Sequence, residues 1–201
     1  MNRLSREYAK TKVVHGLLRV FVKPPTELFD KPGYLHPLEG RILYWLASQV
    51  PADGQVVEVG SYKGKSSGFL AAGLTPGARL ACVDTWRNDA MPYDEPSDSM
   101  SEFVINLGPY WDSIDVCRGR SVEVAVSWSR QIDLLFIDGD HSYEGCSTDL
   151  TSWFPYVRSG GWIAFHDSSQ DGVIRTIREF YPPSMRYCER KAWSIFAARK
   201  R

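Results

Sequence analysis

Four short apolar runs along the chain each contain a carboxylate or are followed by one. The runs span residues 56–60, 80–84, 134–138 and 162–167. Nearly continuous apolar runs of this length are typical of strands that are buried on both faces of a parallel sheet. The carboxyl ends of parallel strands meet at one edge, where open α/β sheets bind ligands. We therefore expect four acids to lie together at that edge, where they suit hydroxyls, cationic groups or a metal ion: Glu58, Asp84, Asp138 and Asp167.

Segments with helical spacing alternate with these runs. Apolar residues three or four positions apart predict helices within residues 35–46, 64–71, 144–157 and 173–180, and further strands are expected at 114–117 and 193–196. Strands that alternate with helices predict right-handed crossovers. The pattern therefore predicts an α/β, doubly wound (Rossmann-like) fold, with a mostly parallel sheet and helices on both faces. We expect a helical N-terminal extension over residues 1–34 and a single domain over residues 35–201.

The composition narrows the choice of partners. The 201 residues include 24 basic and 24 acidic side chains, so no net charge attracts nucleic acid, and none is expected as a partner. No apolar run is long enough for a transmembrane segment. The four cysteines match no zinc spacing, which favours reduced thiols in a cytoplasmic protein. An apolar face in the N-terminal extension predicts a helix that packs on its own domain or joins copies into a homo-oligomer, and a helix resting on a membrane surface remains an alternative.

A glycine-rich turn follows the first apolar run. It reads Gly60-Ser61-Tyr62-Lys63-Gly64-Lys65-Ser66 and has three residues between Gly60 and the Gly-Lys-Ser unit, whereas a phosphate-binding P-loop has four. Such a shortened loop is poorly suited to wrap a triphosphate, but it can bring backbone amides close to a small cofactor at a helix N-terminus. A nucleotide hydrolase therefore remains only an alternative.

A long acidic stretch over residues 87–101 fits no predicted element. At the ligand edge of the sheet it would form a lid over a substrate, and elsewhere it would be a solvated surface loop. Both interpretations stay open.

Five motifs together resemble those of class I S-adenosylmethionine (SAM) methyltransferases. The similarity is strongest to catechol and caffeoyl-CoA type O-methyltransferases and to bacterial tailoring enzymes that act on sugars and macrolides. It spans residues 35–198 and rests on these segments in order: Val57–Ser67, Asp84-Thr85-Trp86, Gly119-Arg120-Ser121, Phe136–Tyr143 and Gly160–Asp167. The methyltransferase domain would therefore occupy residues 35–201.

The resemblance implies SAM as the cofactor. It implies that Asp84 binds both ribose hydroxyls, which suits a carboxylate because its two oxygens accept two hydrogen bonds side by side. It places Ser121 beside the adenine amino group. Trp86 would pack on adenine, or be a simple core tryptophan with equal weight. The full set of implied cofactor contacts is Glu58, Gly60, Ser61, Tyr62, Gly64, Ser66, Asp84, Trp86, Ser121 and Asp138.

The resemblance also implies the catalytic groups. Asp138, His166 and Asp167 would hold Mg²⁺, or Mn²⁺ because histidine suits a transition ion, and related enzymes place the third ligand at the position of either His166 or Ser168. His141 follows Asp138 by three residues and is the expected general base. The expected function is a metal-dependent SAM O-methyltransferase for a small hydroxylated acceptor, a sugar or a glycosylated natural product. A SAM-binding module without catalysis is the second alternative.

Overall fold

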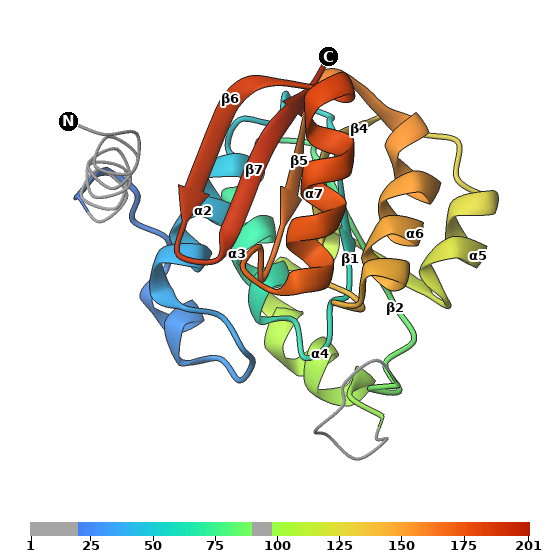
Figure 1. Ribbon diagram of the computed structural model, residues 1–201. Coiled ribbons are helices and arrows are strands. Elements are labelled where there is room, and N and C mark those ends of the chain that lie inside the picture. The colour runs from blue at the N-terminus through green and yellow to red at the C-terminus, as the bar shows by residue number, and fades with distance from the viewer. Residues whose placement is uncertain (1–19, 90–97) are drawn as a thin grey trace.

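A seven-stranded sheet forms the centre of the described part of the protein (Figure 1). The computed structural model describes residues 20–89 and 98–201. The strand order is β3-β2-β1-β4-β5-β7-β6, and all neighbouring strands run parallel except β7, which is antiparallel to β5 and β6. The strands are β1 (Gln55–Val59), β2 (Arg79–Asp84), β3 (Ile114–Arg118), β4 (Ile132–Ile137), β5 (Val157–Phe165), β6 (Met185–Ala192) and β7 (Ile195–Lys200).

Helices cover both faces of the sheet, as the alternation of patterns predicts. Successive residues of a strand point to opposite faces. In β1, accordingly, Val56 packs in one hydrophobic cluster and Val57 in the other. The first cluster also holds residues of α2 (Pro37–Ala47), α3 (Lys65–Gly73) and α4 (Met100–Leu107). The second holds residues of α5 (Ser121–Val126), α6 (Tyr143–Trp153) and α7 (Asp171–Ser184). Three short 3₁₀ helices complete the described elements: η1 (Thr26–Asp30), η2 (Gly108–Ser113) and η3 (Phe154–Tyr156).

Two C-terminal predictions need correction. The helical pattern over 144–157 overshoots, because α6 ends at Trp153 and β5 already begins at Val157. Pro155 explains the early end, since proline lacks the N–H and its ring clashes with the carbonyl four residues before it. The strand expected near 193–196 is confirmed from Ile195, where β7 begins, but Trp193 and Ser194 form the turn of a hairpin. Trp193, with φ +56°, joins β6 to β7.

Some predictions lie wholly or largely outside the described residues. The helical face expected in the N-terminal extension and the acidic stretch over 87–101 are the two cases. In the described part of the extension, Leu28 of η1 is 1% exposed and packs in the same hydrophobic cluster as α2 and α3. Within residues 20–89 and 98–201, no helix is long and apolar enough to cross a membrane.

The turn after β1 packs directly against the segment after β4. Gly60 has φ +89°, and a Cβ on it would lie 2.1 Å from the carbonyl oxygen of Asp138. Only glycine fits this close approach. The Gly60 amide donates to the Val83 carbonyl at 2.9 Å, and the Asp138 amide donates to the Val59 carbonyl at 2.8 Å. The ends of β1, β2 and β4 are thereby held together at one edge of the sheet.

Candidate functional site

Two adjoining cavities lie at the carboxyl edge of the sheet. The first has a volume of about 500 Å³ and the second of about 740 Å³. Five residues line both cavities and so form a common wall: Gly60, Tyr62, Asp138, Gly139 and Asp140. A single elongated ligand passing this wall would reach both spaces.

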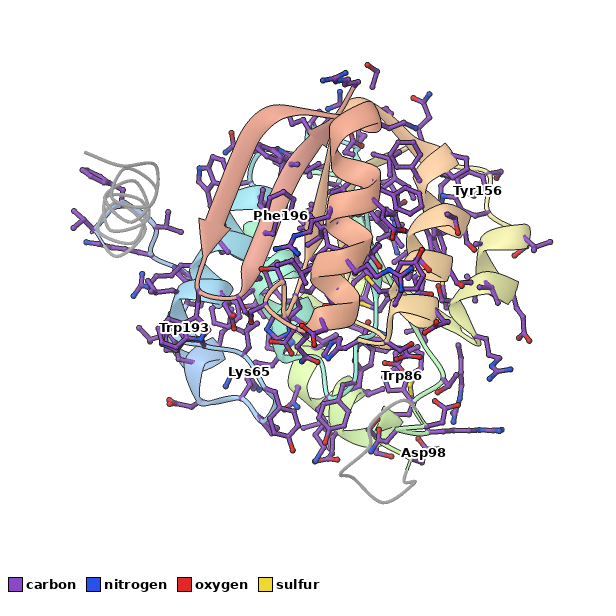
Figure 2. All side chains as sticks on the ribbon, in the orientation of Figure 1. Lys65, Trp86, Asp98, Tyr156, Trp193 and Phe196 are labelled. Carbon is purple, nitrogen blue, oxygen red and sulfur yellow. The ribbon has the colours of Figure 1, made fainter. Side chains whose placement is uncertain are left out.

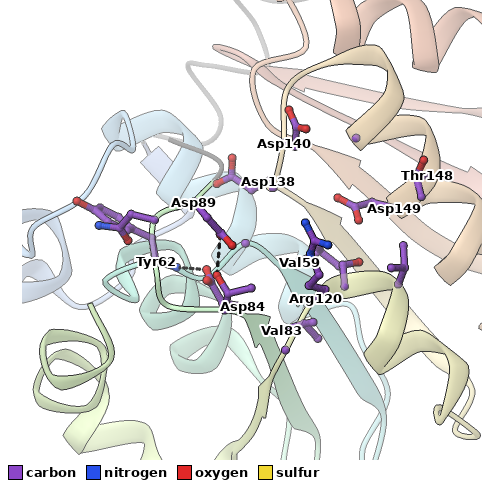
Figure 3. Close-up of a pocket in the computed structure, with 18 of the residues that line it drawn as sticks. Val59, Tyr62, Val83, Asp84, Asp89, Arg120, Asp138, Asp140, Thr148 and Asp149 are labelled. Carbon is purple, nitrogen blue, oxygen red and sulfur yellow. Dashed lines mark hydrogen bonds between the residues drawn. The ribbon is translucent and has the colours of Figure 1, made fainter. Parts of the chain in front are cut away.

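Asp84 organises the first cavity from the end of β2 (Figure 3). One carboxylate oxygen accepts hydrogen bonds from the backbone amides of Ser61 and Tyr62, both at 2.8 Å, and the other accepts from the Trp86 amide at 2.6 Å. Two amides of the glycine turn, which we expected to face a ligand, are therefore bonded to a protein carboxylate. They are not available to cradle a phosphate, which argues against the nucleotide hydrolase.

Ser121 and Asp149 lie on the α5 and α6 side of the first cavity. The Ser121 hydroxyl accepts a hydrogen bond from the indole N–H of Trp153 at 2.8 Å. Asp149 is 8% exposed, and burial raises its pKa to about 6 even though a hydrogen bond from Ser121 lowers it. Figure 3 shows Asp149 across the cavity from Asp84. The sequence analysis missed Asp149. Its only signal was its place beside the apolar stripe of α6.

Glu58 does not lie among the acids of the edge, contrary to expectation. It lies inside β1 with no exposed surface and lines neither cavity, because the glycine turn closes over it. The hydroxyls of Ser61, at 2.8 Å, and Ser67 donate to its carboxylate. Burial raises the pKa of Glu58 to about 7, although hydrogen bonds from serine side chains act in the opposite direction. Glu58 thus connects the turn to α3 rather than touching a ligand in these cavities.

Two further expected cofactor contacts, Trp86 and Gly64, line neither cavity. Trp86 has no exposed surface, and its ring centroid lies 4.8 Å from that of Phe103 in the hydrophobic core. This burial favours the core alternative for Trp86. Gly64 lines neither cavity; it precedes α3 with φ +83°, and a Cβ there would lie 3.1 Å from Phe103.

The second cavity contains a cluster of histidines and carboxylates. His166 follows the end of β5, and its Nδ1 lies 2.9 Å from Asp138 Oδ1. His141 Nε2 lies 3.4 Å from the same oxygen. The Asp167 carboxylate lies 3.5 Å from His141 Nδ1 and 3.8 Å from His166 Nδ1. Asp138, His141, His166 and Asp167 therefore meet as the sequence predicted, although they come from two separate strand ends.

Glu39 of α2 extends this cluster into the core. It is 2% exposed, and its carboxylate accepts from the His36 amide at 2.8 Å and the Ser194 amide at 3.0 Å. The same carboxylate lies 3.2 Å from His166 Nε2. Sequence reasoning missed Glu39, because it looked like the polar side of an amphipathic helix. A glutamate three residues after an N-cap was the available signal, but histidine is an unusual cap.

The charges of the cluster are coupled. Burial acts to lower the pKa of His166, but the carboxylates of Asp138 and Glu39 outweigh it and raise that pKa to about 11. Burial likewise opposes ionisation of Asp138, yet the two imidazoles bring its pKa below the ordinary value. The hydrogen bond to Asp138 raises the pKa of His141 above its usual range. Asp138 and Glu39 are thus ionised at neutral pH, with the His166 imidazolium between them.

One potential ligand atom from each of Asp138, His141 and His166 lies within 4.8 Å of the others, which is compatible with a shared metal ion. This set replaces the expected Asp167 with His141. Gln170, which the sequence analysis also missed, bridges the two residues. Its amide nitrogen lies 2.8 Å from Asp167 Oδ2 and 3.1 Å from His141 Nδ1. Ser168, the alternative third ligand, lines neither cavity.

Comparison with known proteins agrees with the geometry. Residues 57–168, more than half of the chain, match the family model described as a methyltransferase domain. A curated relative, uncharacterized protein R132 of Acanthamoeba polyphaga mimivirus, is 50% identical over 36 residues. That match covers 18% of this chain and only 16% of the mimivirus protein.

Several solved methyltransferases share the fold. The O-methyltransferase TomG from Streptomyces achromogenes, in complex with SAM, has a TM-score of 0.67 at 16% identity, over 100% of this chain and 99% of TomG. An O-methyltransferase from Bacillus cereus, in complex with S-adenosylhomocysteine (SAH), has a TM-score of 0.64 at 18% identity, over 94% and 98% of the two chains. A methyltransferase from Geobacter sulfurreducens has a TM-score of 0.67 at 14% identity, over 94% and 96%. At these identities the likeness establishes the fold and not the substrate.

Proposed function

The chain belongs to the methyltransferase-domain family, and from that premise we propose that it transfers a methyl group from SAM to a hydroxyl of a small polyol acceptor. One observation carries the proposal: two cavities share a wall that contains Asp138 and Gly60, and the second cavity contains a histidine suited to accept a proton. The wall provides a place where a donor in one cavity meets an acceptor in the other.

The first cavity suits the adenosine part of the cofactor. Asp84 accepts three backbone hydrogen bonds, two on Oδ2 and one on Oδ1, which leaves one acceptor site on Oδ1 for a ribose hydroxyl. Ser121 and Asp149 then flank the adenine, where carboxylate and hydroxyl oxygens accept from its amino group. The sulfonium lies at the shared wall, where the negative charges of Asp138 and its neighbours stabilise it.

His141 acts as the general base. Its Nε2 faces Asp138, so a proton on Nε2 leaves a lone pair on Nδ1. This lone pair faces the Gln170 amide nitrogen at 3.1 Å and would accept the hydroxyl proton once the acceptor takes the place of that amide. The acceptor oxygen forms its bond to the methyl carbon while the carbon–sulfur bond breaks, which releases SAH as a neutral thioether. Asp138 stabilises the resulting imidazolium on the Nε2 side, and the Asp167 carboxylate, 3.5 Å from Nδ1, stabilises it on the other side.

A divalent ion fits the same cluster, with a preference that follows from its ligands. Asp138, His141 and His166 offer one carboxylate and two imidazoles, a set that suits Mn²⁺ or a similar transition ion better than Mg²⁺. The Glu39 carboxylate lies 3.2 Å from His166 Nε2, and a carboxylate in this position orients a histidine that binds a metal ion through its other ring nitrogen. Binding would displace the proton that His166 holds, so affinity for the ion should fall as pH falls. When bound, the ion would lower the pKa of the acceptor hydroxyl and would replace His141 in activating it, because a ligating His141 no longer accepts the proton.

The second cavity suits a compact acceptor with a ring. The rings of Tyr34 and Tyr62 stack in its wall with centroids 6.1 Å apart and an interplanar angle of 14°. Sugar and aryl rings both pack on such faces. A sugar or glycosylated natural product remains our preferred acceptor, and the balanced net charge gives no reason to invoke nucleic acid.

The proposal is tested by methyl transfer from labelled SAM to a panel of sugars, glycosides and aryl diols, with and without Mn²⁺. We expect His141→Ala to lower turnover by about 10² to 10⁴-fold while SAH affinity stays within about twofold of the wild type. Turnover should rise with pH through a pKa above that of an ordinary histidine, because the base must be neutral. SAM binding with no transfer to any hydroxyl would refute the catalytic part, and equal loss of binding and turnover would remove His141 from the base role.

A further inference from the structure

Lys65 is a cation beside the second cavity that no described carboxylate neutralises. It lines that cavity together with Lys63 and Ser66. Lys63 is already neutralised, because its Nζ lies 3.1 Å from Glu102. None of the ion pairs between described residues includes Lys65. The Gly64-Lys65-Ser66 unit, which looked like part of a P-loop, thus places at the second cavity a lysine that has no carboxylate partner among residues 20–89 and 98–201.

The aliphatic part of the Lys65 side chain lies against the segment that contains Gly33. Lys65 is the first residue of α3, and Gly33 of the preceding segment lies against its stem. Gly33 has φ +134°, and a Cβ there would lie 2.9 Å from the Cβ of Lys65. Figure 2 shows Lys65 beside this N-terminal segment. A half-buried, packed stem limits the directions that the ammonium can take.

SAM carries a carboxylate that needs a cationic partner such as Lys65. Beyond its sulfonium, the methionine part of the cofactor ends in an ammonium and a carboxylate. Asp138 and Asp140 of the shared wall suit the ammonium, but they would repel the carboxylate. The other cationic side chains of the second cavity, His141 and His166, face carboxylates of the protein.

We propose that Lys65 binds the carboxylate of the methionine part of SAM, so that the Gly-Lys-Ser unit recognises the amino-acid end of the cofactor instead of a phosphate. This inference rests on the proposed function, because it requires the methionine part of SAM to pass the shared wall and lie in the second cavity beside the acceptor. It makes Lys65 a cofactor-binding residue that the sequence motifs alone did not assign.

The two ends of the cofactor can be tested separately with two ligands. SAH carries the amino-acid carboxylate, whereas 5′-methylthioadenosine has the same adenosine and sulfur but lacks the amino acid. Isothermal titration of both ligands compares the wild type with Lys65→Met, which keeps most of the packed stem, and Lys65→Arg, which keeps the charge. Lys63→Met is the matched control, since it removes a cation from the same cavity wall that already has a partner.

We expect Lys65→Met to weaken SAH binding by about 10 to 100-fold, the effect of one lost charge-assisted hydrogen bond, with 5′-methylthioadenosine unchanged. Lys65→Arg should retain most of the SAH affinity, and Lys63→Met should bind both ligands like the wild type. Equal SAH affinity in Lys65→Met and the wild type would overturn the proposal, and so would an equal loss for both ligands. A wild type that binds neither ligand would instead refute the proposed function itself.

Discussion

Replacing Glu58 with glutamine should change how the stability of the protein depends on pH. Glu58 has no exposed surface, and burial raises its pKa from 4.5 to about 7 in the folded protein. Between these values the folded protein holds a proton that the unfolded chain releases. The stability that this proton provides is therefore complete below pH 4.5 and is lost as pH rises through 7. At roughly 1.36 kcal/mol per pKa unit, the loss amounts to about 3 kcal/mol.

Glutamine keeps the shape of the side chain and cannot ionise. The free energy of unfolding of the E58Q variant should therefore lack this pH dependence, although the amide gives up part of the hydrogen bonding with Ser61 and Ser67. Urea unfolding of both proteins from pH 4.5 to pH 8 measures the change, and the wild type should lose about 3 kcal/mol more than E58Q over that range.

Glu123→Gln, at an exposed position on α5, is the matched control and should follow the wild-type curve. Parallel curves for the wild type and E58Q would refute the reasoning. They would mean that Glu58 is already ionised in the folded protein, as it would be if water or a cation reached it.

Two further substitutions test other assignments. Trp86→Ala should destabilise the fold by about 3 to 5 kcal/mol, because the side chain is fully buried against Phe103. SAH affinity, measured by titration at low temperature, should stay close to that of the wild type. Lost affinity without lost stability would restore Trp86 to the adenine site. Glu39→Gln should bring the pKa of His166 down from about 11, because it removes one of the two carboxylates that raise this pKa. NMR titration of the His166 imidazole measures the change, and an unchanged titration would contradict the contact between Glu39 and His166 Nε2.

The sheet and its ligand edge could be predicted from the sequence because they depend on local pattern. Buried parallel strands produce apolar runs, so β1, β2, β4 and β5 were recognisable. The grouping of the acids at the ends of β2, β4 and β5 followed from strand direction alone. The position of Glu58 was misjudged because a run shows that a residue belongs to a strand, but not where the strand ends beneath a folded turn. One residue from the end of β1, its side chain lies under that turn.

The partners of the site residues could not be predicted in the same way. Glu39 and His166 are 127 positions apart, and their contact depends on how α2 packs beside the end of β5. The same is true of Gln170, which is recognisable only once the turn between β5 and α7 places it 3.1 Å from His141. Trp86 directly follows a rim acid and a threonine, and only its burial shows that its side chain turns into the core. Long-range packing decides such cases, and a single sequence does not encode it in any local pattern.

The central claim is that the two adjoining cavities hold SAM, and a thermal shift experiment on the full chain tests it most directly. SAH at about 100 times its dissociation constant should raise the melting temperature by about 5 to 10 °C, while ATP at the same concentration should leave it unchanged. A rise with ATP and none with SAH would contradict the account.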